Sequence, residues 1–396
     1  MPANDGVMSE GRSRLADMIA MVVLFLMAMG AVMVFSAGAS LNYEFDWRRF
    51  YDFPSLRQIM FFPVAVVVLF VASLPNYAFW QFRDRWYNWP TLWLLVLAII
   101  LLVLVLIPSI GTEIHEARRW LRVPLGPASV SFQPSELAKW MMVAFMAGAC
   151  AWLGADIRRF WTRFVPLCLL IGLVCGLIVT QDLGTAVFIG LISFVMLTIA
   201  GAKWWHVLMP LPFGVAGFIA ALYQEPHRFD RLLAFLYPKL YPVVAYQADQ
   251  SLIAIGSGGL LGKGLGQGTC KYGHLPEDTT DFIFAIVGEE LGLLGTIGLI
   301  LLFILFLCLG MLVVLRCRDR FSRLLAAGIV LTIGVQAALN IGVVTVVLPT
   351  KGIPLPFVSS GGTSMLLSSA AVGVLLSIAS RTTQTEPLTS DYLSET

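Results

Sequence analysis

Charged residues are scarce in this chain. Of its 396 residues only 13% are Asp, Glu, Lys or Arg, whereas 58% are hydrophobic, and the mean hydropathy is +0.83. A soluble globular domain carries about twice that charged fraction, so the composition excludes one and indicates a protein whose solvent is the lipid bilayer. The 26 basic and 24 acidic residues nearly balance. No basic face for nucleic acid is therefore indicated.

Cysteine is also sparse. The six cysteines lie mostly within apolar runs, without the spacing of metal ligands or disulfides, and we interpret them as small hydrophobic residues: Cys150, Cys168, Cys175, Cys270, Cys308 and Cys317. No small-residue cleavage site follows the first apolar run. Leu15 to Phe35 is therefore expected to be a retained span rather than a secretory signal.

Ten apolar runs are long enough to cross a hydrocarbon core of about 30 Å. They lie at residues 15–37, 57–74, 91–109, 134–153, 163–180, 184–200, 205–223, 282–315, 322–348 and 358–380. The predicted fold class is all-α, a polytopic membrane protein with ten transmembrane helices. Its predicted parts are a cytoplasmic tail at 1–14, a membrane domain at 15–381 and a cytoplasmic tail at 382–396, with a large extracytoplasmic loop at 224–280 between spans seven and eight.

Basic residues of the short loops predict the orientation. They all fall on one side of the predicted spans: Arg12, Arg14, Arg83, Arg85, Arg158, Arg159, Arg163, Lys203, Arg316, Arg318, Arg320, Arg323 and Arg381. Short cytoplasmic loops carry an excess of Lys and Arg, so both termini are expected in the cytoplasm and the 224–280 loop outside.

The outer loop contains the glycine-rich stretch GSGGLLGKGLGQGTCKYG, residues 256–273. It lacks the spacing of a phosphate-binding loop, because Gly264 follows Lys263 where Ser or Thr is needed. Two interpretations stay open: a backbone that bends sharply and lies close to another segment, or a flexible surface loop. The preceding YQADQSLIAI has the composition of an interfacial amphipathic helix.

Three polar stretches interrupt the apolar pattern. In SFQPSELAKW, Pro134 and Glu136 suit the first turn of a helix, but Lys139 lies one turn deeper, where a cation pairs, snorkels or serves a site. In TQDLGTA, Gln181 and Asp182 are favoured as caps of a tight turn over a role in a site. In LPTKGIPLPFVSSGGTS, three prolines exclude regular helix, and such backbone at membrane depth is tolerated only when it is buried in protein or lines a wet cavity.

Acidic residues gather in LPEDTTDFIFAIVGEELG, residues 275–292, at the predicted start of the eighth span. Asp281 in the first helical turn, behind Thr279 and Thr280 as N-caps, would gain stability from the helix dipole. Asp281 is also a functional candidate, because an ionisable group at the point where a chain enters the membrane commonly serves a site. Glu289 and Glu290 lie about two turns further in, and at least one is expected to face a partner or a cavity.

In this order, ARRWL, SFQPSELAKW, QDLGTA, GKGLGQG, LPEDTTDFIFAIVGEELG and LPTKGIPLPFVSSGGTS resemble the shape, elongation, division and sporulation (SEDS) proteins, the FtsW/RodA family, over residues 15–381. FAIVGEELG is more similar to the division members, FtsW, than to the elongation members, RodA. The resemblance implies a multi-pass peptidoglycan glycosyltransferase that polymerises lipid II at the outer face of the bacterial cytoplasmic membrane, for septal wall synthesis. It implies as partners undecaprenyl pyrophosphate-linked glycan, a class B penicillin-binding protein and other divisome membrane proteins.

The resemblance also implies that the Asp of the TDF motif, Asp281, is the essential acidic residue of catalysis. We expect its carboxylate to act as general base. Substrate-binding residues are expected in the neighbouring motifs, at Arg118, Arg119, Gln133, Ser135, Glu136, Lys139, Glu277, Lys351, Ser359, Gly361 and Gly362. One of the two arginines and Lys139 are expected to neutralise the pyrophosphate. A divalent cation, Mg²⁺ or Mn²⁺, is a further candidate for that charge, although no ligand spacing fixes a site. No organic cofactor is expected.

Two positions depart from the family's pattern. Thr279 stands where His is common, and Ser360 stands where Tyr is common. The first departure removes an imidazole from beside Asp281, and the second changes the pocket next to the last extracytoplasmic turn.

Other functions fit part of the pattern. A transporter that flips lipid II also uses many spans with broken segments, but it needs polar groups accessible from both faces, whereas the polar groups here gather outside. A non-catalytic scaffold for division partners predicts that Asp281 can be neutralised without loss. Within the family, an elongation-type polymerase similar to RodA is the alternative.

Overall fold

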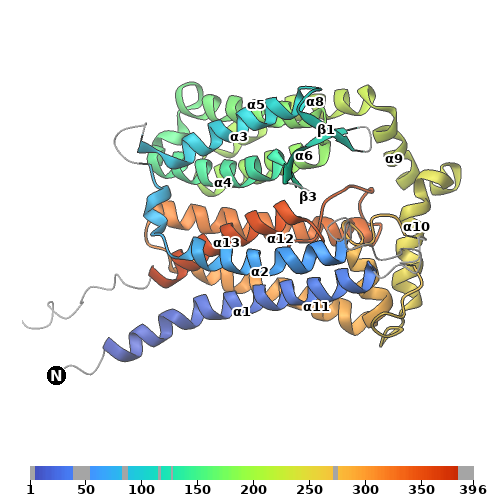
Figure 1. The fold of residues 1–396 in the computed structure, drawn as a ribbon. Coiled ribbons are helices and arrows are strands. Elements are labelled where there is room, and N and C mark those ends of the chain that lie inside the picture. Colours follow the sequence, from blue (N-terminus) through green and yellow to red (C-terminus); the bar gives the residue numbers. More distant parts are fainter. Residues whose placement is uncertain are drawn as a thin grey trace, which may run out of the picture.

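The computed structural model describes residues 5–38, 54–82, 88–114, 117–125, 128–270 and 275–381. Long helices form a bundle, and a small sheet and two helices gather at one end of it (Figure 1). The helices of the bundle are α1 (Asp5–Ala37), α2 (Pro54–Ser73), α3 (Pro90–Leu106), α4 (Pro134–Leu153), α5 (Val165–Val179), α6 (Leu183–Ile199), α7 (Trp204–Leu208), α8 (Leu211–Gln224), α11 (Ile283–Arg316), α12 (Arg320–Val344) and α13 (Gly362–Arg381). The predicted tail at 382–396 lies outside the described residues.

In the described part of the chain, seven helices are long and apolar enough to cross a membrane. They lie in Arg14–Ala37, Pro134–Arg158, Phe160–Val179, Trp204–Gln224, Ile283–Arg316, Arg320–Val344 and Gly362–Arg381. Three shorter apolar helices, Gln58–Ser73, Pro90–Leu106 and Leu183–Ile199, coincide with the other predicted spans. A helical, polytopic membrane fold is thus confirmed, and the number of ten spans stays a prediction.

Burial separates the centre of the bundle from its edge. The apolar part of α12 is 72% buried and that of α4 is 61% buried, whereas the segment that contains α7 and α8 is only 6% buried. Helix α12 packs against α4, α6, α11 and α13. The structure therefore has α4 and α12 as its central helices, with α8 at the periphery.

Arginine side chains close the end of the bundle that lies away from the sheet. The Nη2 atom of Arg320 donates to the carbonyl oxygens of Gly154 (3.1 Å) and Ala200 (2.6 Å), just beyond the last turns of α4 and α6. Arg381 donates to the carbonyl of Leu74 (2.7 Å), after the end of α2. Cations at helix C-termini satisfy free carbonyls and interact favourably with the dipole.

The all-α prediction is wrong at the 111–133 loop. This segment forms a three-stranded antiparallel sheet of β1 (Gly111–Ile114), β2 (Ala117–Leu125) and β3 (Ala128–Phe132) in the order β1-β2-β3. Leu121 pairs with Gly111 on one side and with Phe132 on the other. The strand period was hidden in the sequence because arginines occupy both faces of β2, with Arg118 and Arg119 adjacent.

Several predicted helix ends also differ. The span predicted at 205–223 is two helices, because α7 ends at Leu208 and α8 begins at Leu211. Helix α12 ends at Val344 rather than 348 and α13 begins at Gly362 rather than 358. Prolines at 349, 354 and 356 prevent regular helix between them. The predicted position of Asp281 inside the first turn is wrong too, since α11 begins at Ile283 and its N-cap, Phe282, makes no side-chain capping bond.

Helix α11 is broken near its N-terminal end. Gly292 has φ 66° and ψ −161°, which frees the backbone groups around it. The glycine-rich segment, residues 256–270 in the described part, takes up those groups: Lys263 N–H donates to Glu289 O (3.0 Å), and Leu293 N–H donates to Gly259 O (2.9 Å). Buried backbone groups need such partners.

Glycine is required where this segment crosses α11. A β-carbon at Gly262, whose φ is +81°, would lie 2.1 Å from the carbonyl oxygen of Glu290. A β-carbon at Gly258 would lie 2.0 Å from the carbonyl oxygen of Gly288. The interpretation of sharp bends and close approach is confirmed, because no other residue type fits this contact.

Glu289 and Glu290 are both fully buried beneath the glycine-rich segment. Glu289 accepts hydrogen bonds from Lys263 Nζ (2.6 Å) and from the N–H of Thr269 (2.8 Å). Glu290 accepts from the hydroxyl of Ser36 in α1 (2.6 Å). The expectation that at least one of these acids faces a partner is confirmed for both.

Candidate functional site

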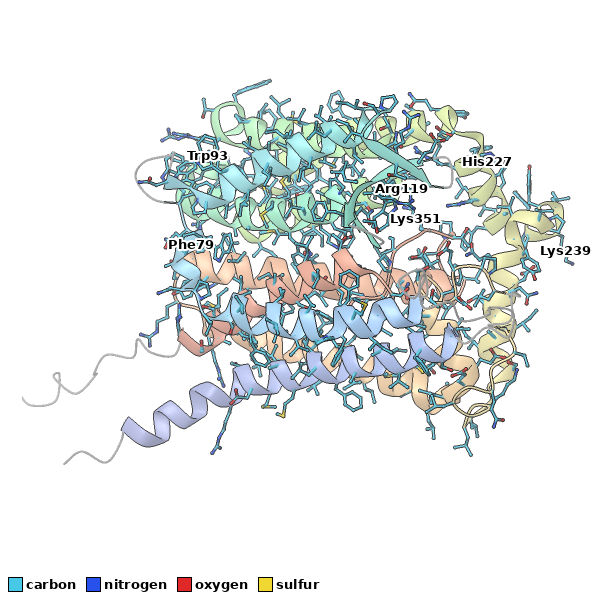
Figure 2. All side chains as sticks on the ribbon, viewed as in Figure 1. Phe79, Trp93, Arg119, His227, Lys239 and Lys351 are labelled. Atoms are coloured by element: carbon cyan, nitrogen blue, oxygen red, sulfur yellow. The ribbon has the colours of Figure 1, made fainter. Side chains whose placement is uncertain are left out.

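The predicted site lies at the end of the bundle that carries the sheet, the short helix α9 (Pro226–Leu236) and α10 (Pro242–Ser257). Arg119 and Lys351 lie close together there in Figure 2, whereas Phe79 lies at the opposite end. Asp281 belongs to the turn at 275–282 that precedes α11.

The backbone around Asp281 is held by the central helix. In α12, the Nδ2 atom of Asn340 donates to the carbonyl oxygens of Asp281 (2.7 Å) and Ile353 (2.7 Å). The hydroxyl of Ser359 donates to the carbonyl of Thr280 (2.5 Å). The turn at 275–282 and the loop at 345–361 are therefore fixed to each other and to α12.

Thr279 and Ser360, the two departures from the family's pattern, contact each other. The N–H of Ser360 donates to the carbonyl oxygen of Thr279 at 2.9 Å. Both side chains are buried, and the hydroxyl of Ser360 has no hydrogen-bond partner among the residues that the structure describes. The two departures therefore lie together in the fold, at the residue that stands two positions before Asp281.

The carboxylate of Asp281 is half-buried among charges of both signs. Burial, followed by the charges of Glu277 and Asp182, raises the pKa of Asp281 to about 7, against the opposing effect of Arg119 and Arg231. A general base works best when its pKa lies near the working pH. Asp281 has that property, which an exposed aspartate lacks.

Arg118 and Arg119 point in different directions because neighbouring residues of a strand face opposite sides. The Nε atom of Arg118 lies 3.2 Å from Oε2 of Glu113, its partner on β1. The Nε atom of Arg119 donates to the carbonyl of Gln181 (2.7 Å), and its Nη1 atom lies 3.9 Å from Oδ2 of Asp182. Of the two arginines, Arg119 is the one that faces the acids of the site.

Asp182 has two relationships in the structure. Its Oδ1 atom accepts a hydrogen bond from the N–H of Thr185 (3.0 Å), so the predicted turn cap at the start of α6 is confirmed. Its charge also acts on Asp281 and on Lys351. Sequence reasoning favoured the cap over a site role, and the geometry gives Asp182 both.

Lys351 lies between this charged cluster and an apolar cavity. Burial lowers the pKa of Lys351, and the charge of Asp182 opposes that shift. The cavity has a volume of about 190 Å³ and is lined by side chains of α6, α12 and the loop at 348–353. A lysine at the mouth of an apolar cavity is suited to an amphipathic ligand with an anionic head.

Glu136 and Lys139 form a pair in the interior of the bundle. Their side chains are 2.8 Å apart, and Nζ of Lys139 also donates to Oε1 of Gln336 (2.9 Å) in α12. Lys139 is only 3% exposed. The predicted pairing of Lys139 with an acid is confirmed, but neither residue is among the charged groups that shift the pKa of Asp281. Gln336 connects them to the loop at 345–361, through the carbonyl of Pro354 (2.9 Å).

The other predicted positions make contacts of the fold. Glu277 has a positive φ of 57°, and Oε2 accepts a hydrogen bond from the hydroxyl of Thr280 (2.7 Å). A β-carbon at Gly362 would lie 2.8 Å from the ring of Phe61. The rest lie at the starts of α4 and α13: Gln133, Ser135 and Gly361.

Sequence reasoning missed Arg231 and Asn340. Arg231 belongs to α9, within the long segment whose charges were set aside when the orientation was predicted. Its spacing of three residues from Arg228 on an amphipathic helix was the available signal. Asn340 looked like an ordinary polar residue of a membrane helix, although such residues commonly make buried hydrogen bonds.

Within the described part of the chain, no group of three or more His, Cys, Asp or Glu side chains could hold a metal ion. Asp281 faces two acids, but Arg119 and Arg231 already supply positive charge there. The divalent cation stays a prediction from the sequence.

Known proteins share both the sequence and the fold. A family model described as "Cell cycle protein", for FtsW, RodA and SpoVE, matches residues 16–384. The chain belongs to this family. Family members similar to it include "Stage V sporulation protein E" of Bacillus subtilis, 38% identical over 91% of this chain and 96% of that protein. Another is "Probable peptidoglycan glycosyltransferase FtsW" of Geobacter metallireducens, 36% identical over 92% of this chain and 94% of that protein.

Solved structures of FtsW/RodA/SpoVE proteins have the same fold. One, described as "Structural coordination of polymerization and crosslinking by a peptidoglycan synthase complex", has a TM-score of 0.70 and 27% identity, and covers 93% of this chain and 98% of its own. The rod shape determining protein RodA of Thermus thermophilus has a TM-score of 0.63 and 28% identity, and covers 91% of this chain and 95% of its own. The helical architecture is therefore the family's.

Proposed function

We propose that this protein is a peptidoglycan glycosyltransferase that polymerises lipid II. The observation that carries the proposal is the carboxylate of Asp281, which lies half-buried between two acids and two arginines at one end of a membrane-protein bundle. Relatives about 36% identical over most of the chain bear the name of that activity. The FAIVGEELG motif supports the division type over the elongation type.

The reaction needs one base and a set of cations. Asp281 takes the proton from a sugar hydroxyl of one lipid II molecule, and the hydroxyl oxygen attacks the anomeric carbon of the growing glycan. The bond from that carbon to the lipid pyrophosphate breaks at the same time. Arg119 and Lys351 neutralise the leaving pyrophosphate, as positioned charges do in other reactions that release phosphate groups. Lys139 is linked through Gln336 to the carbonyl of Pro354, in the loop that carries Lys351.

In the membrane, we place the site at the outer face, with ten spans and both termini in the cytoplasm. A reporter that works only after export should then be active when it is fused after Gly273. A reporter that works only in the cytoplasm should be active when it is fused after Asp319. The reversed result would overturn the orientation and, with it, access of Asp281 to lipid II outside.

We also propose a class B penicillin-binding protein as partner and the division septum as the place of action. The fold similarity to a peptidoglycan synthase complex supports a partner that crosslinks the glycan. Polymerisation should accordingly be measured with the purified chain alone and together with its class B penicillin-binding protein.

The decisive experiment compares wild type with Asp281→Asn. Asparagine keeps the volume of the side chain but cannot accept a proton at neutral pH. Loss of a general base costs about 10² to 10⁴ in rate, so glycan chains on a gel should disappear while the variant still binds its partner. Glu277→Gln is the matched control, with a milder effect, because Glu277 is exposed and bonded to Thr280.

Other functions would give other results. Near wild-type polymerisation by Asp281→Asn would show that Asp281 is not the base. Translocation of lipid II by the wild-type protein without any polymer would identify a transporter. A wild-type protein that makes no polymer, together with an Asp281→Asn variant that still supports division, would identify a scaffold.

A further inference from the structure

The corner between α5 and α6, residues 179–182, binds two elements from outside the bundle. From α9, Arg228 donates to the carbonyl oxygens of Val179 (Nη1, 3.1 Å) and Thr180 (Nη2, 2.7 Å). From β2, Arg119 donates to the carbonyl of the next residue, Gln181 (2.7 Å). Three successive carbonyls thus hold two arginines, and Asp182 follows them directly.

Arg228 also holds the end of α8. Its Nη1 atom lies 3.4 Å from the carbonyl oxygen of Ala221, in the last turn of that helix. The ends of two helices present their negative dipole ends to one guanidinium, whose planar fork suits several carbonyls at once. Helix α8 is peripheral and little buried, and this contact joins α8 and α9 to the end of α5, in addition to the packing of α9 against α10.

The same face of α9 carries a second arginine. Arg231 follows Arg228 by three residues, so the two side chains lie on one face of the helix. The charge of Arg231 acts on Asp281, as does the charge of Arg119. Both cations that oppose the two acids around Asp281 are therefore attached, through α9 or through β2, to the α5–α6 corner.

We propose that Arg228 is a positioning residue for the site: by binding the carbonyls of the α5–α6 corner it fixes α9 and, with it, Arg231, whose charge acts on Asp281 beside that of Arg119. The inference rests on the proposed function for its consequence in catalysis, but the electrostatic coupling it describes belongs to the fold and is measurable without turnover.

Loss of Arg228 changes the balance of charges on Asp281 in one direction. Glu277 and Asp182 raise the pKa of Asp281, and Arg119 and Arg231 lower it. When α9 is released, Arg231 moves away while both acids stay, so the pKa of Asp281 rises further. Since the base must be ionised, the acid side of the pH–rate profile moves to higher pH.

The experiment measures the ionisation of Asp281 by two readouts in Arg228→Gln, Arg231→Gln and the double variant. The first is the pH–rate profile of lipid II polymerisation in the complex with the penicillin-binding protein. The second is a difference in melting temperature, between each variant and the same variant with Asp281→Asn added, measured as a function of pH. The midpoint of the change in this difference follows the ionisation of Asp281 without any turnover.

The expected result is a shift of both midpoints to higher pH. Removing Arg231 should shift them by about 0.5 to 1 pH unit, and Arg228→Gln should shift them in the same direction. In the double variant the shift should be smaller than the sum of the single shifts. Both substitutions remove the effect of one cation, Arg231, on Asp281. Arg228→Lys, which keeps a cationic donor, should give a smaller shift than Arg228→Gln.

Lys239→Gln is the control, since it removes one positive charge from the outer edge of the same end of the molecule (Figure 2). It should leave both midpoints unchanged. If Arg228→Gln lowers the rate equally at every pH and leaves the melting midpoint in place, Arg228 is merely structural and the inference is overturned. A shifted melting midpoint without polymer from the wild-type protein would sustain the inference and overturn the proposed function.

Discussion

Gly352 lies directly against the carboxylate of Asp281. A β-carbon at position 352 would stand 2.9 Å from Oδ2 of Asp281, closer than side-chain carbons come to other atoms without movement. The carboxylate occupies the space that any larger residue at 352 would need.

Gly352→Ala should therefore lower lipid II polymerisation at least about tenfold by displacing the base, since small displacements of a catalytic group cost up to about 10² in rate. Gly256→Ala in α10 is the matched control, because a β-carbon there meets no described atom within 4 Å. Both variants should melt within a few degrees of wild type. Equal activity of the two variants would show that the carboxylate moves aside freely.

The raised pKa of Asp281 predicts a pH dependence of activity. With a value of about 7, half of the Asp281 side chains are protonated near neutral pH and cannot serve as base. Polymerisation should fall about tenfold for each pH unit below that value and level off above it. A profile that is flat down to pH 5 would mean an unperturbed carboxylate.

The same pKa predicts a pH-dependent stability. Because burial favours the neutral form, the folded state holds the proton of Asp281 more tightly than the unfolded chain does. The stability that this gives is full below about pH 4, where both states are protonated, and it is lost as the pH rises from about 4 to about 7. Asp281→Asn should melt higher than wild type at pH 8, and the difference should shrink steadily as the pH falls to about 4. A variant that melts lower at both pH values would show that the ionised carboxylate stabilises the fold.

Ser359 and Ser360 are neighbours with opposite predicted effects. The hydroxyl of Ser359 donates to Thr280 O and accepts from Leu355 N–H (2.8 Å), so Ser359→Ala leaves a buried N–H unpaired and should cost about 1 to 3 kcal/mol. Ser360→Ala removes a buried hydroxyl that has no partner and should be neutral or stabilising. Melting temperatures of the purified variants decide, and a larger loss in Ser360→Ala would contradict the assignment.

The ion pair of Lys263 and Glu289 predicts a loss of stability when the cation is removed, since the Glu289 side chain is fully buried although that of Lys263 is 30% exposed. Lys263→Met leaves the carboxylate of Glu289 only with its other donors, the N–H groups of Thr269 and Cys270 among them, which should cost about 1 to 3 kcal/mol. Arg159→Gln breaks the exposed pair with Asp156 (3.2 Å) and should cost about 1 kcal/mol or less. Thermal unfolding of both variants in detergent tests the contrast, which fails if their melting temperatures fall equally.

The sequence predicted the helices because apolar runs of this length leave few other structures in a bilayer. Their ends were less predictable. The 282–315 run is continuous in hydropathy, yet Gly292 breaks the helix, because the energy that stabilises the break comes from hydrogen bonds to residues about thirty positions earlier. The sheet at 111–132 was hidden for a similar reason: its pairing is set by partners across the strands rather than by a clear alternation within β2.

The site was predictable from the sequence where the residue type alone indicates a functional role. A carboxylate next to a long apolar run, as Asp281 is, stands out in this chain even though it lies in the turn before α11 rather than in the helix. Geometry was needed to separate Arg118 from Arg119, since a strand sends them to opposite sides, and to place Lys139 with Gln336 in the interior. Arg228 and Arg231 were hidden because their importance comes from carbonyls and acids far away in the chain.

The break in α11 has a consequence for how the chain is made. The carbonyl of Glu289 and the N–H of Leu293 find their partners on Lys263 and Gly259, which leave the ribosome before them. The N-terminal part of α11 is incomplete on its own, because these backbone groups are satisfied only when residues 259–263 have folded back onto it. Insertion of this helix into a membrane is thereby tied to folding of the loop ahead of it, since a delay in that folding would leave unpaired peptide groups facing lipid.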